Sequence, residues 1–155
     1  MEAKYINPFI SAAVNALQTM ASLTPERGAP FVKDKFEALA DMSGIIGFAG
    51  DMKGAVIMCF PMELAAIIYE SLTGDPPPAD DLHPIADAVG ELANMVAGGA
   101  KGPLSEMGLN IQISIPSIVC GKNHMVLNSG DGPCLVVPFT LRGYTFWVQI
   151  RMKKE

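Results

Sequence analysis

Three polar side chains recur at helical spacing in the second half of the chain: Asp87, Glu91 and Asn94. A helix turns about 100° per residue, so the three should project within about 60° of one another. They offer two carboxylates and one carboxamide, a group that both donates and accepts hydrogen bonds. On one face of a helix, this set could meet a partner or a reacting group.

Small and apolar residues should occupy the other sides of the same helix. The small stripe is Ala86, Gly90, Ala93 and Ala97, and the apolar band is Ile85, Ala88, Val89, Leu92, Met95 and Val96. The small stripe would let a partner's backbone approach, or it would pack against another helix, for which the second helix is a candidate. Polar residues opposite a core band are most often a solvated face. Geometry alone therefore leaves both interpretations open.

The pattern predicts three helices and six extended segments. The third helix should run from about Pro84 to Met107, with an interruption near Gly98, Gly99, Gly102 and Pro103. The first should begin at Asn7 as N-cap, with Pro8 in the first helical position. The second should run from about Pro61 to Leu72 and stop at Gly74. The extended segments are 31–36, 43–49, 53–60, 111–119, 134–141 and 144–152, with turns at 50–54 and 142–143, a connector at 75–81 and a loop at 128–133.

This order of elements suggests a tandem repeat of helix plus three strands, over about 5–60 and 84–153, in a single domain of residues 1–155. Without a gap, the core residues of the first and third helices align: Ile10, Ala13, Val14, Leu17 and Met20 with Ile85, Ala88, Val89, Leu92 and Met95. The predicted fold class is α+β, a mostly antiparallel sheet covered by helices. In the last strand, alternation places Tyr144 and Phe146 on one face and Trp147 on the other.

Composition excludes several classes of protein. The chain has 155 residues, of which 50% are hydrophobic and 17% charged, and its formal net charge is -5. An acidic chain without a basic patch is not typical of nucleic-acid binding. No apolar run approaches the roughly 18 residues of a membrane span, and the N-terminal residues do not resemble a signal peptide.

The cysteines and histidines indicate no metal or redox chemistry. Cys59, Cys120 and Cys134 are odd in number and widely spaced, which favours reduced core thiols in a cytoplasmic protein. His83 and His124 have no metal-ligand spacing and are expected on the surface. No metal or cofactor is therefore expected in this chain.

Further motifs surround the polar set. The pattern Asp87-x-x-x-Glu91-x-x-Asn94 lies within a run that continues Met95-Val96-Ala97-Gly98-Gly99-Ala100-Lys101, and Pro116 follows in an extended segment. The chain opens with Tyr5-Ile6-Asn7-Pro8-Phe9. Together these motifs resemble the CheC, CheX and FliY phosphatases, and most of all CheX, over essentially the whole chain. The resemblance implies a CheC-like fold and hydrolysis of the aspartyl phosphate on a CheY-like response regulator in chemotaxis.

The resemblance also implies roles for single residues. Asn94 would hold a water molecule in line with phosphorus, and Glu91 would pair with a lysine of the receiver domain. Asp87 and Pro116 would support the site or the contact. Mg²⁺ is expected on the receiver, not on this chain.

The partners implied are a phosphorylated CheY-like receiver and a second copy of the chain in a homodimer. In the repeat alignment, Ala16 and Thr19 stand where the third helix has Glu91 and Asn94, so one active site per chain is expected. The alternatives are a non-catalytic receiver-binding adaptor of the same fold and a plain structural subunit.

Overall fold

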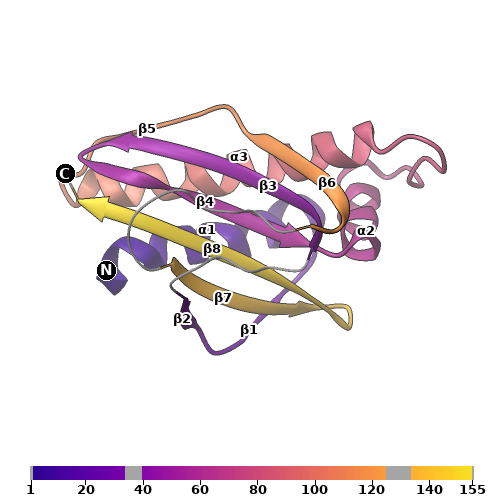
Figure 1. Cartoon of the computed structure of the whole chain (residues 1–155), viewed down its shortest axis with the longest axis horizontal. Coiled ribbons are helices and arrows are strands. Elements are labelled where there is room, and N and C mark those ends of the chain that lie inside the picture. Colours follow the sequence, from indigo (N-terminus) through magenta and orange to yellow (C-terminus); the bar gives the residue numbers. More distant parts are fainter. Residues whose placement is uncertain (1, 34–39, 125–133, 155) are drawn as a thin grey trace.

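The described chain forms one β-sheet with helices packed against it (Figure 1). The computed structural model describes residues 2–33, 40–124 and 134–154. The elements are α1 (Ala3–Ala21), β1 (Glu26–Arg27), β2 (Phe31–Lys33), β3 (Ala40–Gly50), β4 (Met52–Phe60), α2 (Met62–Thr73), α3 (His83–Glu106), β5 (Ile111–Ile113), β6 (Ser117–His124), β7 (Cys134–Leu141) and β8 (Tyr144–Lys154). Across these ranges no helix has the length and apolar character to cross a membrane.

The sheet is antiparallel at every described strand pair, in the order β1-β7-β8-β4-β3-β5, with β2 also pairing with β7 and β6 with β3. The short strands β1 and β2 thus pair with the β7–β8 hairpin from the second half of the chain. In turn, β5 and β6 pair with the β3–β4 hairpin from the first half. α1 and α3 run behind the sheet in Figure 1, and α2 lies at one end. This arrangement confirms the predicted α+β class, while the domain boundaries and the duplication stay predictions.

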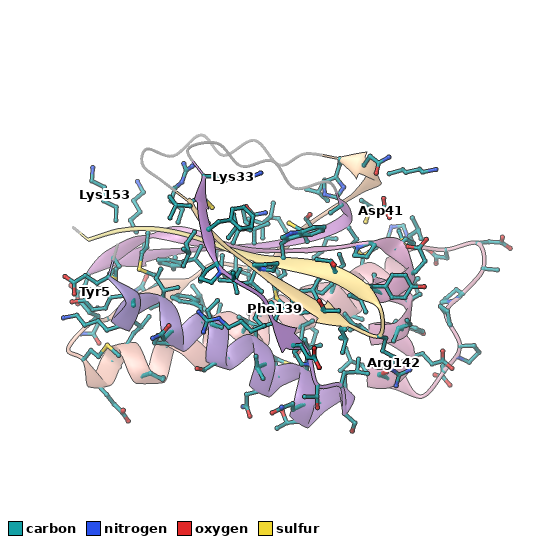
Figure 2. All side chains as sticks on the ribbon, turned by 90° about the horizontal axis from the view of Figure 1, so that it is seen from below. Tyr5, Lys33, Asp41, Phe139, Arg142 and Lys153 are labelled. Atoms are coloured by element: carbon teal, nitrogen blue, oxygen red, sulfur yellow. The ribbon has the colours of Figure 1, made fainter. Side chains whose placement is uncertain are left out.

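The main core lies between the helices and one face of the sheet (Figure 2). Phe146 stacks on both Phe60 and Phe139, each with ring centroids 5.1 Å apart. A smaller cluster on the opposite face contains Cys59, Val136 and the half-buried Trp147. The last strand therefore contributes apolar side chains to both faces, and the predicted separation of Phe146 from Trp147 is confirmed.

The first helix begins earlier than the sequence suggests. α1 starts at Ala3, and Pro8 lies inside it rather than at its first position. Proline removes one backbone hydrogen bond from a helix. The additional turn is stabilised because Tyr5 and Ile6 are buried in the core, and burial of such side chains contributes about 1.5–3 kcal/mol each.

The third helix is continuous, so the predicted interruption near its glycines and Pro103 is wrong. α3 runs unbroken from His83 to Glu106. Ala100 and Leu104 are fully buried on its inner face, and this packing holds the last turns in place. A Cβ on Gly99 would lie 3.0 Å from the Cβ of Ala12, so this glycine lets α1 cross closely.

The strand predicted at 111–119 is two strands. β5 ends at Ile113 and β6 begins at Ser117, because Pro116 has no backbone N–H to donate to a ladder. β6 extends to His124, which is half-buried and not on the open surface as expected: its Nε2 lies 2.7 Å from the Oγ of buried Ser43 on β3. The strand predicted at 31–36 is described only as β2, and its remainder, like the 128–133 loop, lies outside the described residues.

The prediction of three core thiols is also partly wrong. Cys59 and Cys134 are buried, and burial raises the pKa of Cys59 to about 12. Cys120 is exposed on β6. β6 is a sheet edge with mostly exposed side chains, which its short apolar run did not indicate.

Candidate functional site

The start of α3, which carries Asp87, Glu91 and Asn94, is held by the Asp81 carboxylate just before the helix. The Asp81 carboxylate accepts hydrogen bonds from the backbone N–H of His83 at 3.0 Å and from its ring Nδ1 at 2.8 Å. These bonds lower the pKa of Asp81, and the same carboxylate raises the pKa of His83. Pro84 follows in the first turn, where a missing N–H is tolerated. His83 is exposed, as expected.

The buried side of α3 sets the direction of its polar side. Ile85, Val89, Leu92 and Val96 are at most 3% exposed and belong to the main core. Their positions on the helix turn Asp87, Glu91 and Asn94 outward, and all three residues are exposed. The structure therefore brings the three predicted side chains to one solvent-facing stripe.

The side chains of Glu91 and Asn94 are free of partners within the chain. Among the described residues, neither the Glu91 carboxylate nor the Asn94 carboxamide makes a hydrogen bond or an ion pair. The two residues are one helical turn apart. Both groups are thus available to another molecule.

The small stripe of α3 is not an open surface. A Cβ on Gly90 would lie 3.3 Å from Cδ1 of Ile118 in β6, and a Cβ on Gly44 in β3 would lie 3.2 Å from that of Ala93. The stripe therefore lets the sheet approach the helix. The two interpretations from the sequence, an approaching partner and packing by α2, are therefore replaced by packing against β3 and β6.

Pro116 lies beside the polar stripe. Its Cγ is 3.8 Å from the position of a Cβ on Gly90, the residue before Glu91. The break between β5 and β6 thus forms one flank of the exposed stripe. The structure brings Pro116 to the site, although it is 22 residues from Asn94 in the chain.

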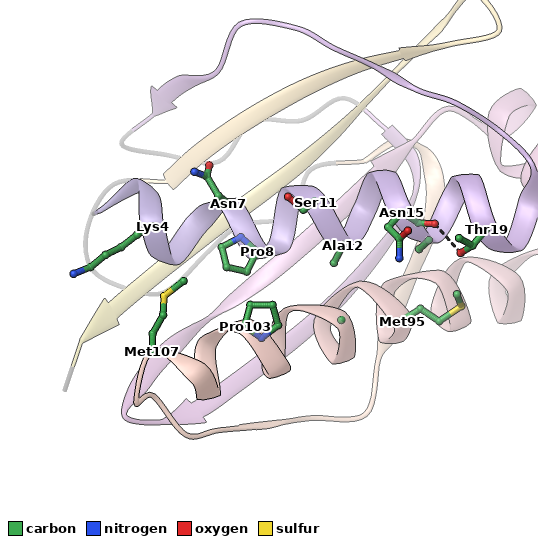
Figure 3. A pocket seen from close by; sticks show the side chains of 12 residues that line it. Lys4, Asn7, Pro8, Ser11, Ala12, Asn15, Thr19, Met95, Pro103 and Met107 are labelled. Carbon is green, nitrogen blue, oxygen red and sulfur yellow. Dashed lines mark hydrogen bonds between the residues drawn. The ribbon is translucent and has the colours of Figure 1, made fainter.

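A groove between α1 and α3 forms the other flank (Figure 3). Its volume is about 720 Å³, and neither Glu91 nor Asn94 lines it. Its α1 wall is mostly polar and its α3 wall is not: the lining residues are Lys4, Asn7, Pro8, Ser11, Ala12, Asn15, Ala16, Thr19, Met95, Gly99, Pro103 and Met107. The exposed stripe is therefore bordered by surfaces of different polarity.

The corresponding positions of α1 differ chemically. Ala16 is buried, and the Thr19 hydroxyl donates to the backbone oxygen of Asn15 at 2.7 Å. Met20, expected in the core, is 53% exposed near the end of the helix. α1 therefore presents neither a carboxylate nor a carboxamide at the two matched positions.

The Asp41 carboxylate holds the end of β6 in place, and no pattern in the sequence indicated this role. Asp41 on β3 accepts hydrogen bonds from the backbone N–H of Met62 at 2.9 Å and of Asn123 at 3.1 Å. These bonds lower the pKa of Asp41. The side chain connects the start of α2 and the end of β6 to the sheet.

In the described ranges no group of three His, Cys, Asp or Glu residues could hold a metal ion.

Comparisons with known proteins agree with this geometry. Residues 42–140 match the family model described as chemotaxis phosphatase CheX. The chain is 26% identical over 131 residues to the CheY-P phosphatase CheX of Thermotoga maritima, covering 84% of each chain. A CheC-like superfamily protein from Shewanella sp. PV-4 is 36% identical over 99% of both chains, with a TM-score of 0.91. The CheX–CheY–BeF3–Mg²⁺ complex from Borrelia burgdorferi contains a chain 28% identical, with a TM-score of 0.80 and coverage of 97% of this chain and 98% of that one.

Proposed function

Since the chain belongs to the CheX family of chemotaxis phosphatases, we propose that it hydrolyses the aspartyl phosphate of a CheY-like receiver domain, with Glu91 and Asn94 as its working residues. The observation that carries the assignment of residues is the exposed stripe of α3. Two polar groups one turn apart have no partner in the described chain and are held on a rigid helix. A relative with this fold has been solved in a complex with CheY, BeF3 and Mg²⁺.

The reaction needs little from this chain beyond position. The Asn94 carboxamide, whose oxygen accepts and whose NH₂ donates hydrogen bonds, holds a water molecule with its oxygen in line with phosphorus. The water oxygen bonds to phosphorus as the bond to the aspartate oxygen breaks, and the aspartate leaves as a carboxylate. Both protons of the water leave with the released phosphate as H2PO4⁻, which then equilibrates with solvent. Mg²⁺ and a lysine on the receiver stabilise the phosphoryl charge.

Glu91 acts on the receiver and not on phosphorus. Its carboxylate pairs with the receiver's lysine and fixes the register in which the two proteins dock. Asp87, one turn earlier on the same exposed stripe, supports that contact. Pro116 supports the site through its place beside Gly90.

The test is phosphate release from a phosphorylated receiver. Asn94→Asp should lower turnover on the order of 10²-fold, because it removes the amide donor and places negative charge beside the phosphoryl group. The side chain is exposed, so stability should change by less than about 1 kcal/mol. Asn15→Asp on α1 is the matched control and should keep full turnover.

Glu91→Ala should differ in kind from Asn94→Asp. Loss of an ion pair should weaken binding of the receiver, whereas Glu106→Ala at the far end of α3 should not. A receiver that binds wild-type protein without faster phosphate release would favour the adaptor. Absence of both binding and release would favour a structural subunit.

The same proposal includes a homodimer in the cytoplasm. β6 is the longest of the described strands at the sheet edges, and an unpaired edge can add a strand from a second copy. Cys120 lies near its centre and is exposed, so antiparallel pairing of two β6 strands would bring the two Cys120 side chains close. Oxidation should cross-link wild type but not Cys120→Ser. A monomer by sedimentation at tens of micromolar would count against the dimer.

A further inference from the structure

Ile115 is the most exposed large hydrophobic side chain in the described part of the protein. It is 87% exposed and lies in the break between β5 and β6. A single exposed aliphatic residue is ordinary on a protein surface. The position of this one is not ordinary, because the next residue, Pro116, packs beside Gly90 on α3.

That packing fixes Ile115 close to the exposed stripe of α3. Pro116 Cγ lies 3.8 Å from the position of a Cβ on Gly90, which precedes Glu91. Adding the intervening bonds and Cα–Cα steps of about 3.8 Å places the Ile115 Cα within about 16 Å of that of Glu91. The backbone here is anchored on its other side as well, since the Ser114 N–H donates to the Gly47 oxygen at 2.8 Å.

A receiver that delivers a phosphoryl group to Asn94 is large enough to cover this distance. A standard protein interface buries about 800 Å² on each partner, which corresponds to a disc of about 16 Å radius. A footprint centred on Glu91 therefore includes Ile115. The groove on the opposite flank of the stripe has a mostly polar α1 wall and can stay hydrated.

We propose that Ile115 is an apolar anchor for the receiver domain, so that the receiver docks with a hydrophobic patch against the β5–β6 break and its phosphorylated aspartate over Asn94. This inference rests on the proposed function and adds a residue that determines affinity and orientation. Burial of an aliphatic side chain at an interface contributes through the water it releases. A second copy is the alternative occupant: if it paired on β6 about Cys120, Ile115 would lie five residues, or about 16 Å, from the two-fold axis, and its replacement would weaken the dimer instead of receiver binding.

The test compares Ile115→Ser with Val32→Ser. Val32 is 64% exposed on β2, which pairs with β7 near the edge of the sheet opposite to β5 and β6. The substrate is a phosphorylated CheY protein that the wild-type chain dephosphorylates. Ile115→Ser should raise KM about tenfold and leave kcat within about twofold, because uniform binding is lost and the chemistry is not. Val32→Ser should change neither.

Binding of the same CheY, charged with beryllofluoride and Mg²⁺, should weaken by the same factor without any change in the thermal midpoint. An unchanged KM and affinity in a folded Ile115→Ser protein would overturn the proposal, and so would a loss confined to dimer formation in sedimentation. Asn94→Asp distinguishes the two levels. If it retains turnover, the proposed catalytic role fails; if it loses turnover while Ile115→Ser behaves as wild type, only the anchor fails.

Discussion

Replacing Gly98 and Gly99 of α3 with alanine should change the stability of the protein in opposite directions. The two glycines are adjacent in one helix, and alanine is about 0.8–1.0 kcal/mol more favourable than glycine in a helix interior. Their surroundings differ. A Cβ on Gly98 would meet nothing within 4 Å, whereas a Cβ on Gly99 would lie 3.0 Å from the Cβ of Ala12 in α1.

For Gly98→Ala the helix preference acts alone. The free energy of unfolding should rise by about 1 kcal/mol, which for a domain of this size raises the melting midpoint by about 2–4 °C. For Gly99→Ala the same gain is opposed by the contact with Ala12, whose Cβ cannot swing away because it has no rotatable side chain. Separating two packed helices by a few tenths of an ångström costs about 1–3 kcal/mol, so the net change should be a loss of about 1 kcal/mol.

Thermal melts and urea unfolding of the two variants beside wild type measure the difference directly. The expected gap between the variants is about 2 kcal/mol, or roughly 4–8 °C. Equal stabilisation by both substitutions would refute the inference that Gly99 is required for the close crossing of α1 and α3. Destabilisation by Gly98→Ala would show that the exposed face of α3 is packed in the free protein.

The remaining predictions concern Asp41 and the first half of the chain. Asp41→Asn should lower the free energy of unfolding by about 1–3 kcal/mol at neutral pH, because an amide NH₂ then faces one of the backbone N–H groups of Met62 and Asn123. The folded-state pKa of Asp41 is depressed below its ordinary value of 3.8. Its contribution to the free energy of unfolding is therefore present above pH 3.8 and is lost as the pH falls through the folded pKa. Urea unfolding from pH 7 to pH 3 should show the stability difference between wild type and Asp41→Asn narrowing. Thr19→Asn, at an exposed position, should leave phosphate release within about twofold of wild type if only α3 carries a site, and a loss as severe as that of Asn94→Asp in a folded variant would contradict the single site.

Local patterns predicted the elements and the polar stripe well. The apolar residues at 85, 89, 92 and 96 recur at helical spacing, and a helix that buries them must turn Glu91 and Asn94 to solvent. Alternation on the last strand separated Phe146 from Trp147 for the same kind of reason. In each case one face of one element decides the result, and that information is contained in a short stretch of chain.

Local patterns failed where a distant segment supplies the stabilising contact. Pro8 and the glycines of α3 are poor helix residues by themselves, and the helices continue through them because Tyr5, Ala100 and Leu104 are buried against other elements. The small stripe of α3 could not be distinguished from an open surface until β3 and β6 were seen to occupy it.

The sequence by itself determined the type of each chemical group at the site and the helix face that carries Glu91 and Asn94, because these depend on residue identity and on the helical period. Only the tertiary structure decided what borders that face. It placed Pro116 and Ile115 on one side and the α1–α3 groove on the other. The physical reason is that those neighbours come from strands and helices far away in the chain, and their positions depend on how the antiparallel sheet pairs the two halves.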